Sequence, residues 1–221
     1  MPKIRLGLIS ESLHTTQIPL MPYHAIEAVF RDIDGILHTG EAPSENILDM
    51  LSEIAPTQAV TTMSTTANVQ DKRVMTFGDI RIGLTHGYRH PLVESYFSIQ
   101  QRLGNIYAGG RHLLDTLPTR FAEDDVDVIV FGHLHIPLTL KRDDVLLINP
   151  GAVYTISEDL AQWELLRETN PDRRYLLETY LRNQKSDSYK MPTRSTVGIL
   201  EINEDYSISA KIQPLPQFVF A

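Results

Sequence analysis

The chain has 221 residues, long enough for one large domain with a full core or for two small ones. Hydrophobic residues make up 42% and charged residues 22%, which are ordinary values for a globular protein, and no apolar run approaches the roughly 18 residues of a membrane-spanning helix. The formal net charge of −8 without a Lys/Arg cluster argues against a nucleic-acid-binding protein, and the absence of cysteine excludes disulfide and thiolate–metal chemistry.

Strand-like and helix-like segments alternate in the first part of the chain. Apolar runs predict strands at 4–9, 35–40 and 59–62, and helical spacing of apolar residues predicts helices at 23–30 and 44–54. The N-terminal segment reads as a buried strand, because a signal peptide would have a longer apolar stretch and a small-residue cleavage site. We therefore expect a cytoplasmic protein.

Hairpins follow the alternating segments. We predict a hairpin of 74–77 and 80–84 across Gly78-Asp79, a helix at 91–103, a strand at 126–131, and a hairpin of 139–141 and 145–148. Strands interleaved with helices and then hairpins predict an α/β fold, a layered sandwich of mixed β-sheets flanked by helices.

Residues 156–190 do not continue this pattern of strands, helices and hairpins. They read as two charged amphipathic helices, at 157–168 and 172–184, and a closing hairpin of 197–202 and 206–212 follows. We expect one domain over 1–221 with a helical insertion at about 156–190. The insertion reads as a solvated cap, and the alternatives are a cover over the site or a contact between copies in a homo-oligomer.

The strongest chemical signal is Gly132-His133-Leu134-His135, which directly follows the apolar strand 128–131. Two histidines separated by one residue at a strand exit can both turn towards one site, and the leading glycine permits the bend. The alternative is a pair of ordinary loop histidines. The Asn149-Pro150-Gly151 turn that follows the next hairpin favours a built site.

Three more groups of polar side chains follow predicted strands. His86-Gly87 follows the strand at 80–84, Glu41 follows the strand at 35–40, and Glu11 and His14 follow the first strand. Phosphate-ester hydrolysis near neutral pH needs a nucleophile and an offset for phosphoryl charge, and two metal ions about 3.5–4 Å apart supply both. Histidine and carboxylate side chains at strand exits are the expected ligands of such ions.

The order of these segments resembles the small prokaryotic branch of the calcineurin-like metallophosphoesterases, a superfamily related to the retromer scaffold subunit. Family members carry Ser-Asp-x-His-Gly, Ala-Gly-Asp, Gly-Asn-x-Asp, His-Gly, Gly-His-Thr-His and Asn-Pro-Gly-Ser in that order. The likeness covers residues 1 to about 155 and resumes near Pro192. The last three motifs match in type and order at His86-Gly87, Gly132-His133-Leu134-His135 and Asn149-Pro150-Gly151.

The resemblance implies a role for each residue. His86 and His133 would bind one divalent metal and act in catalysis, His135 would bind a second metal, and Asn149-Pro150-Gly151 would form a structural turn. Glu41 would stand where the family has its bridging Asp, and Glu11 where it has its first Asp. Manganese, iron, zinc or nickel suits such ligands, as one ion or two.

The first half of the family site is altered. Both aspartates are replaced by glutamates, at 11 and 41, and the family's first His aligns with Leu13, beside His14. The Gly-Asn-x-Asp motif is replaced by the segment at 61–68. Because the extra methylene of Glu moves its oxygens by about one bond length, the ligand geometry must differ from that of the family.

Two functions fit this pattern. One is a divergent metal-dependent phosphoesterase, a phosphodiesterase that hydrolyses a small phosphorylated substrate with a metal-activated water. The other is a catalytically degenerate relative that acts as a binding or scaffold protein. Neither reading involves nucleic acid or a membrane.

Overall fold

The computed structural model describes residues 2–10, 23–40, 45–60, 71–102, 108–153, 178 and 195–215. The chain divides into two compact units, a larger one of residues 1–88, 113–154 and 194–221 and a smaller one of residues 89–112 and 155–193. The helices expected at 157–168 and 172–184 lie outside the described residues, apart from Glu178, and the single domain over 1–221 stays a prediction. Within the described ranges, no helix is long and apolar enough to cross a membrane.

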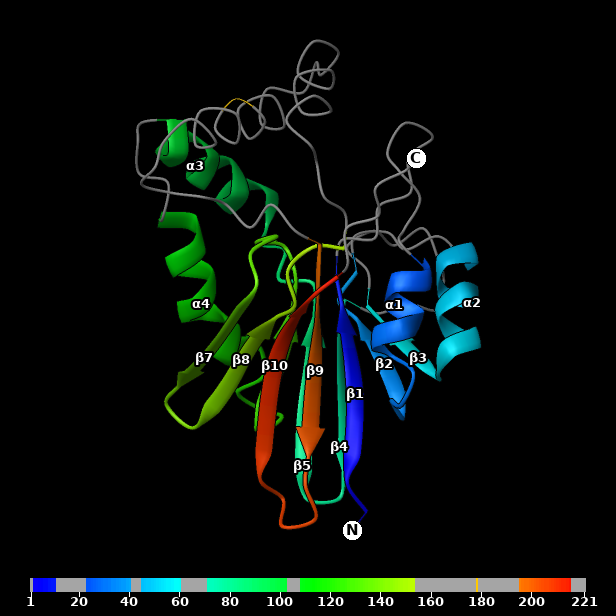
Figure 1. Cartoon of the computed structure of the whole chain (residues 1–221). Coiled ribbons are helices and arrows are strands. Elements are labelled where there is room, and N and C mark those ends of the chain that lie inside the picture. The colour runs from blue at the N-terminus through cyan, green and yellow to red at the C-terminus, as the bar shows by residue number, and fades with distance from the viewer. Residues whose placement is uncertain are drawn as a thin grey trace. The chain divides into compact units, whose positions relative to one another are not determined.

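The first sheet of the larger unit has the strand order β10-β9-β1-β2-β3 (Figure 1). Strands β1, β2 and β3 are parallel, while β9 pairs antiparallel with β1 and β10 antiparallel with β9. Their bounds are Ile4–Ile9, Gly35–His38, Thr57–Ala59, Thr196–Ile202 and Ile208–Pro214, for β1, β2, β3, β9 and β10 respectively. The closing hairpin expected from the sequence is β9 and β10.

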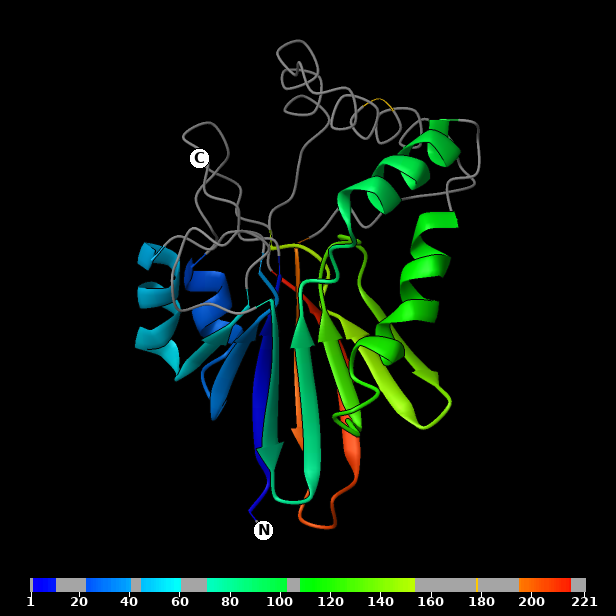
Figure 2. The ribbon, with the colours of Figure 1, turned by 180° about the vertical axis from the view of Figure 1, so that it is seen from behind.

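The second sheet has the strand order β4-β5-β6-β8-β7, and Figure 2 shows it from the other side. Strands β5, β6 and β8 are parallel, and β4 and β7 are antiparallel edge strands. Gly78 has φ 62° in the β4–β5 turn, which is the conformation that a two-residue hairpin turn with glycine at its first central position requires. The bounds are Lys72–Phe77, Ile80–Thr85, Val128–Phe131, Leu138–Arg142 and Val145–Asn149, for β4 to β8 in order.

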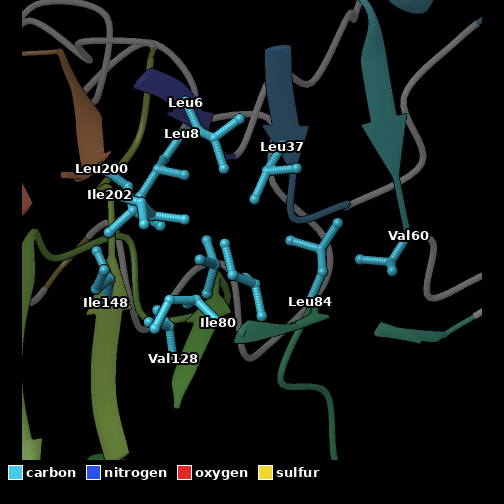
Figure 3. Packing of buried hydrophobic residues seen from close by; sticks show 12 residues of the cluster. Leu6, Leu8, Leu37, Val60, Ile80, Leu84, Val128, Ile148, Leu200 and Ile202 are labelled. Carbon is cyan, nitrogen blue, oxygen red and sulfur yellow. The ribbon is translucent and has the colours of Figure 1, made fainter. Parts of the chain in front are cut away.

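The two sheets of the larger unit pack face to face. Their inner faces contribute one cluster of buried aliphatic side chains (Figure 3), in which Leu8, Leu37 and Leu200 of the first sheet meet Leu84, Val128 and Ile148 of the second. Outward-facing residues of these strands are buried as well, so the strand sequences are almost continuously apolar. The predicted sandwich of mixed β-sheets flanked by helices is confirmed.

Helices cover the outer faces of both sheets. Helices α1 (Tyr23–Val29) and α2 (Glu45–Ile54) pack on the first sheet, through side chains such as Ile26 and Leu51. On the second sheet lie Leu113 and Leu117 of α4 (Ala108–Arg120) and Phe121 just beyond it.

The sequence reading did not predict α4. Gly109, Gly110 and Pro118 lower its intrinsic helix propensity, so its formation depends on packing against the sheet.

The smaller unit includes α3 (Pro91–Arg102), which the sequence predicted within one residue, and Arg89 just before it. The Arg89 guanidinium, in a residue only 8% exposed, donates two hydrogen bonds of 2.9 Å to the Glu94 carboxylate and one of 2.6 Å to the Gly109 carbonyl. It also lies over the Phe97 ring, at 4.7 Å from the centroid. Arg89 therefore ties the start of α3 to the start of α4.

Gly83 of β5 offers a test of the α4 packing. A Cβ at this position would lie 2.6 Å from Cε1 of the Phe121 ring, so Gly83→Ala forces the ring away from the sheet. We expect a loss of about 1–3 kcal/mol in the free energy of unfolding, measured with urea. Ser209→Ala, at an exposed site of β10, is the control and should change it by less than about 0.5 kcal/mol.

A double variant isolates the cause. In the Phe121→Leu background the smaller side chain leaves room for the new methyl group, so Gly83→Ala should cost less than it does alone. Equal costs in both backgrounds would contradict the proposed contact.

Candidate metal centre

The carboxyl ends of the parallel strands carry the residues that the sequence singled out. His86 follows β5 directly, and His133 and His135 lie in the loop after β6. The other three predicted ligands, Glu11, His14 and Glu41, lie outside the described residues. The structure thus bears on three of the six predicted ligands, His86, His133 and His135.

His86 is held in one tautomer by a hydrogen bond across the two sheets. Its side chain is nearly buried, at 3% exposure, and Nδ1 lies 3.1 Å from the carbonyl oxygen of Thr39 at the exit of β2. Because a carbonyl oxygen only accepts hydrogen bonds, Nδ1 carries a proton, and in the neutral imidazole Nε2 then carries the lone pair. A histidine whose second ring nitrogen donates to a carbonyl is the usual arrangement of a metal ligand.

His133 lies beside His86. The two ring centroids are 5.4 Å apart with an interplanar angle of 74°. The loop backbone is strained to place this ring, since His133 has φ 69° and the Leu134 amide donates to the Gly132 carbonyl at 2.8 Å across it. That hydrogen bond with a positive central φ defines a γ-turn of the rare, strained kind. Strain of this sort in a non-glycine residue clusters at functional sites.

His135 shares this unusual backbone. It has φ 55° and is half-buried, so two of three consecutive loop residues lie in the left-handed region. Among the residues that the structure describes, no group of three or more His, Asp or Glu side chains is close enough to hold a metal ion. Within that part of the chain His86 and His133 are brought together, and His135 does not complete a three-ligand group with them.

Asn149 fixes the loop that carries His133. Its side chain is fully buried, and Nδ2 donates to the Gly132 carbonyl at 2.7 Å while Oδ1 accepts from the Gly151 amide at 2.9 Å. The Gly132 amide in turn donates to the His86 carbonyl at 3.0 Å. The exits of β5, β6 and β8 are therefore joined in series. The expectation that Asn149-Pro150-Gly151 forms a structural turn is confirmed.

His38 and Thr39 shape the exit of β2. Nδ1 of the buried His38 accepts a hydrogen bond of 3.0 Å from the Gly40 amide, and Gly40 has φ 92°. His38 therefore stabilises the turn that leads towards residue 41. The hydroxyl of Thr39 is buried and has no hydrogen-bond partner within the described ranges. A polar group near His86 is therefore able to form a further hydrogen bond.

These groups suit a divalent cation. Two imidazoles lie side by side, one of them with its lone-pair nitrogen set by a buried carbonyl, and imidazole is a ligand for zinc, manganese, iron and nickel. Sequence reasoning missed the Thr39 carbonyl, because a backbone oxygen 47 residues from its partner leaves no residue-type signal.

The chain resembles known metallophosphoesterases in sequence. Residues 5–167 match the calcineurin-like phosphoesterase superfamily domain. The chain is 31% identical over 147 residues to a probable metallophosphoesterase of Methanocaldococcus jannaschii, an alignment that covers 66% of this chain and 67% of the relative. A probable metallophosphoesterase of Methanothermobacter thermautotrophicus is also 31% identical, over 155 residues, with 66% and 76% covered.

A solved structure shares the fold. Wild-type Vps29 from Entamoeba histolytica, in complex with zinc, superposes with a TM-score of 0.57 at 18% sequence identity. The match covers 96% of this chain and 99% of that one.

Asn149 provides a test of the loop architecture. Asn149→Ala removes both side-chain hydrogen bonds and leaves the Gly132 carbonyl and the Gly151 amide buried without them. We expect the free energy of unfolding to fall by about 2–4 kcal/mol, measured by urea or thermal unfolding.

The matched control is Asn203→Ala, which removes one hydrogen bond to Ser207 in the exposed β9–β10 turn. It should cost less than about 1 kcal/mol. If both substitutions cost the same, Asn149 does not fix the loop.

Proposed function

Since the chain belongs to the calcineurin-like phosphoesterase superfamily, we propose that it is a metal-dependent phosphodiesterase with His86 and His133 at the centre of its site. The observation that carries the proposal is the hydrogen bond from His86 Nδ1 to the Thr39 carbonyl, beside the His133 ring. It gives His86 the tautomer of a metal ligand before any ion binds.

The family implies divalent metal ions, and the donors in this chain define where one would be held. We propose His86 Nε2 and His133 as ligands, with His135, Glu11, His14 and Glu41 as further ligands of one or two ions. When bound, such a cation lowers the pKa of a coordinated water and offsets charge on the phosphoryl group. Manganese, iron, zinc and nickel all suit this donor set.

The protein's own groups prepare the site for hydrolysis. A phosphodiester is hydrolysed when a water oxygen forms a bond to phosphorus and the bond to the leaving alcohol breaks. The Thr39 carbonyl holds the His86 ring, and Asn149 holds the backbone of the loop that carries His133. A site that is fixed in advance lowers the barrier because its groups do not have to reorganise during the step. The net charge of −8 does not favour an anionic substrate, and a bound cation would supply local positive charge.

We propose a small phosphorylated substrate, because the specificity of such a site lies in its loops and the chain lacks the basic surface that nucleic acid needs. A cytoplasmic location and a homo-oligomer through residues 156–190 remain proposals from the sequence.

A second candidate is a catalytically degenerate member that acts as a binding or scaffold protein. It is favoured by the altered motifs at residues 11, 13, 41 and 61–68. The likeness to Vps29 at 18% identity shows the fold alone and does not choose between the two functions.

Metal content and hydrolysis distinguish the candidates. We expect the purified protein, loaded with manganese, to retain metal and to hydrolyse bis(4-nitrophenyl) phosphate. His86→Ala and His133→Ala should each lower metal affinity and turnover by at least about 100-fold, because each removes a ligand and leaves the other imidazole without its neighbour. Metal is measured by mass spectrometry after dialysis, and turnover by release of nitrophenolate.

His90→Ala is the matched control, because His90 is an exposed histidine that accepts a hydrogen bond from the Leu92 amide at the start of α3. It should leave both quantities within about twofold. Protein that holds no metal and turns over no ester supports the binding-protein alternative, whereas full activity in both histidine variants overturns the site.

A further inference from the structure

Three aromatic rings form a series from the buried end of the site to the surface. His86 is 3% exposed and contacts His133, and His133 contacts Tyr88, with centroids 5.9 Å apart and an interplanar angle of 86°. Tyr88 is 45% exposed. Its ring is therefore the exposed member of the group and lies directly beside a proposed metal ligand.

The backbone that presents Tyr88 is held by Arg120. The Arg120 guanidinium, in the last turn of α4, donates to the Tyr88 carbonyl at 2.8 Å and to the Gly87 carbonyl at 3.4 Å. Gly87 has φ 96°, a conformation that an L side chain rarely adopts. The chain therefore turns sharply after His86 and is fixed just where Tyr88 leaves it.

A large exposed ring next to the reacting centre has a chemical use. An ester whose phosphoryl group sits at His86 and His133 must extend its organic groups outwards, and Tyr88 lies in contact with His133 on the exposed side. Planar aromatic groups stack on tyrosine, and alkyl groups of similar size gain less from the same surface.

We propose that Tyr88 is a specificity-determining residue that stacks on a planar aromatic group of the substrate, either an aryl ester or a nucleobase. This inference rests on the proposed function, because it assumes that the phosphoryl group binds at the two histidines. The ring of Tyr88 supplies the contact, and its hydroxyl is not required.

The experiment measures binding directly, so that it does not depend on turnover. Phenyl phosphate, cyclohexyl phosphate and methyl phosphate are titrated into manganese-loaded protein by calorimetry. The first two groups have similar size but only phenyl is planar, so their ratio of dissociation constants separates stacking from simple apolar burial.

We expect wild type to bind phenyl phosphate about tenfold more tightly than cyclohexyl phosphate. Tyr88→Ala should bring that ratio close to one, while Tyr88→Phe should keep it. Manganese content and the thermal midpoint should not change in either variant, because an exposed ring contributes little to the fold.

Tyr206→Ala is the matched control. Tyr206 is exposed in the turn between β9 and β10, at the amino ends of the parallel strands, and its loss should leave the ratio as in wild type. The inference is overturned if Tyr88→Ala leaves the phenyl preference intact, if it weakens all three phosphates and the metal equally, or if no phosphate binds.

Hydrolysis of bis(4-nitrophenyl) phosphate by the same preparations tests the proposed function separately. Binding with the Tyr88-dependent preference but without turnover contradicts the enzyme and leaves the stacking contact standing. Turnover without that preference contradicts the stacking contact alone.

Discussion

The hydrogen bond between His86 Nδ1 and the Thr39 carbonyl joins the two sheets at the point where both present their loops. Thr39 belongs to the exit of β2 in one sheet and His86 to the exit of β5 in the other. Both residues are buried, so water does not compete for the bond, and a buried donor or acceptor left without its partner would be costly. This contact therefore joins the two exits and orients the ring of the histidine between them.

The loop of His133 depends on that arrangement. The Thr39 amide donates to the Ile9 carbonyl, the Gly132 amide to the His86 carbonyl, and the Asn149 side chain to the Gly132 carbonyl. These bonds connect the exits of β1, β2, β5, β6 and β8. Positive φ values at His133 and His135 cost about 1–3 kcal/mol each and persist because the surrounding bonds leave the loop no relaxed alternative. Packing of aliphatic side chains between the two sheets stabilises the fold and offsets the cost of these strained backbone conformations.

Much of the fold could be predicted from the sequence, because the periodicity of apolar residues and the preferences of turn residues are local properties of the chain. The apolar runs at β1, β6 and β9 and the Gly78-Asp79 turn all had their expected structures. Helix α4 was missed because Gly109, Gly110 and Pro118 argue against a helix. The spacing of Leu113, Leu117 and Phe121 was the signal that favoured one, and their packing against the second sheet decides the outcome.

The two histidines of the candidate site could also be predicted from the sequence. His86 and His133 follow apolar strands, and the rule that parallel strands gather their carboxyl ends brings them together. The Thr39 carbonyl and the contact of Tyr88 with His133 depend on how the two sheets and their loops meet, which no local pattern encodes.

The most direct test of the proposed metal centre is the long-range proton–nitrogen NMR spectrum of the histidine rings, recorded without metal and with zinc. We expect protonated Nδ1 in metal-free His86, and on zinc addition a joint shift of His86 Nε2 and a His133 ring nitrogen. His86 protonated at Nε2 instead, or zinc that shifts neither ring, would contradict the proposed metal centre.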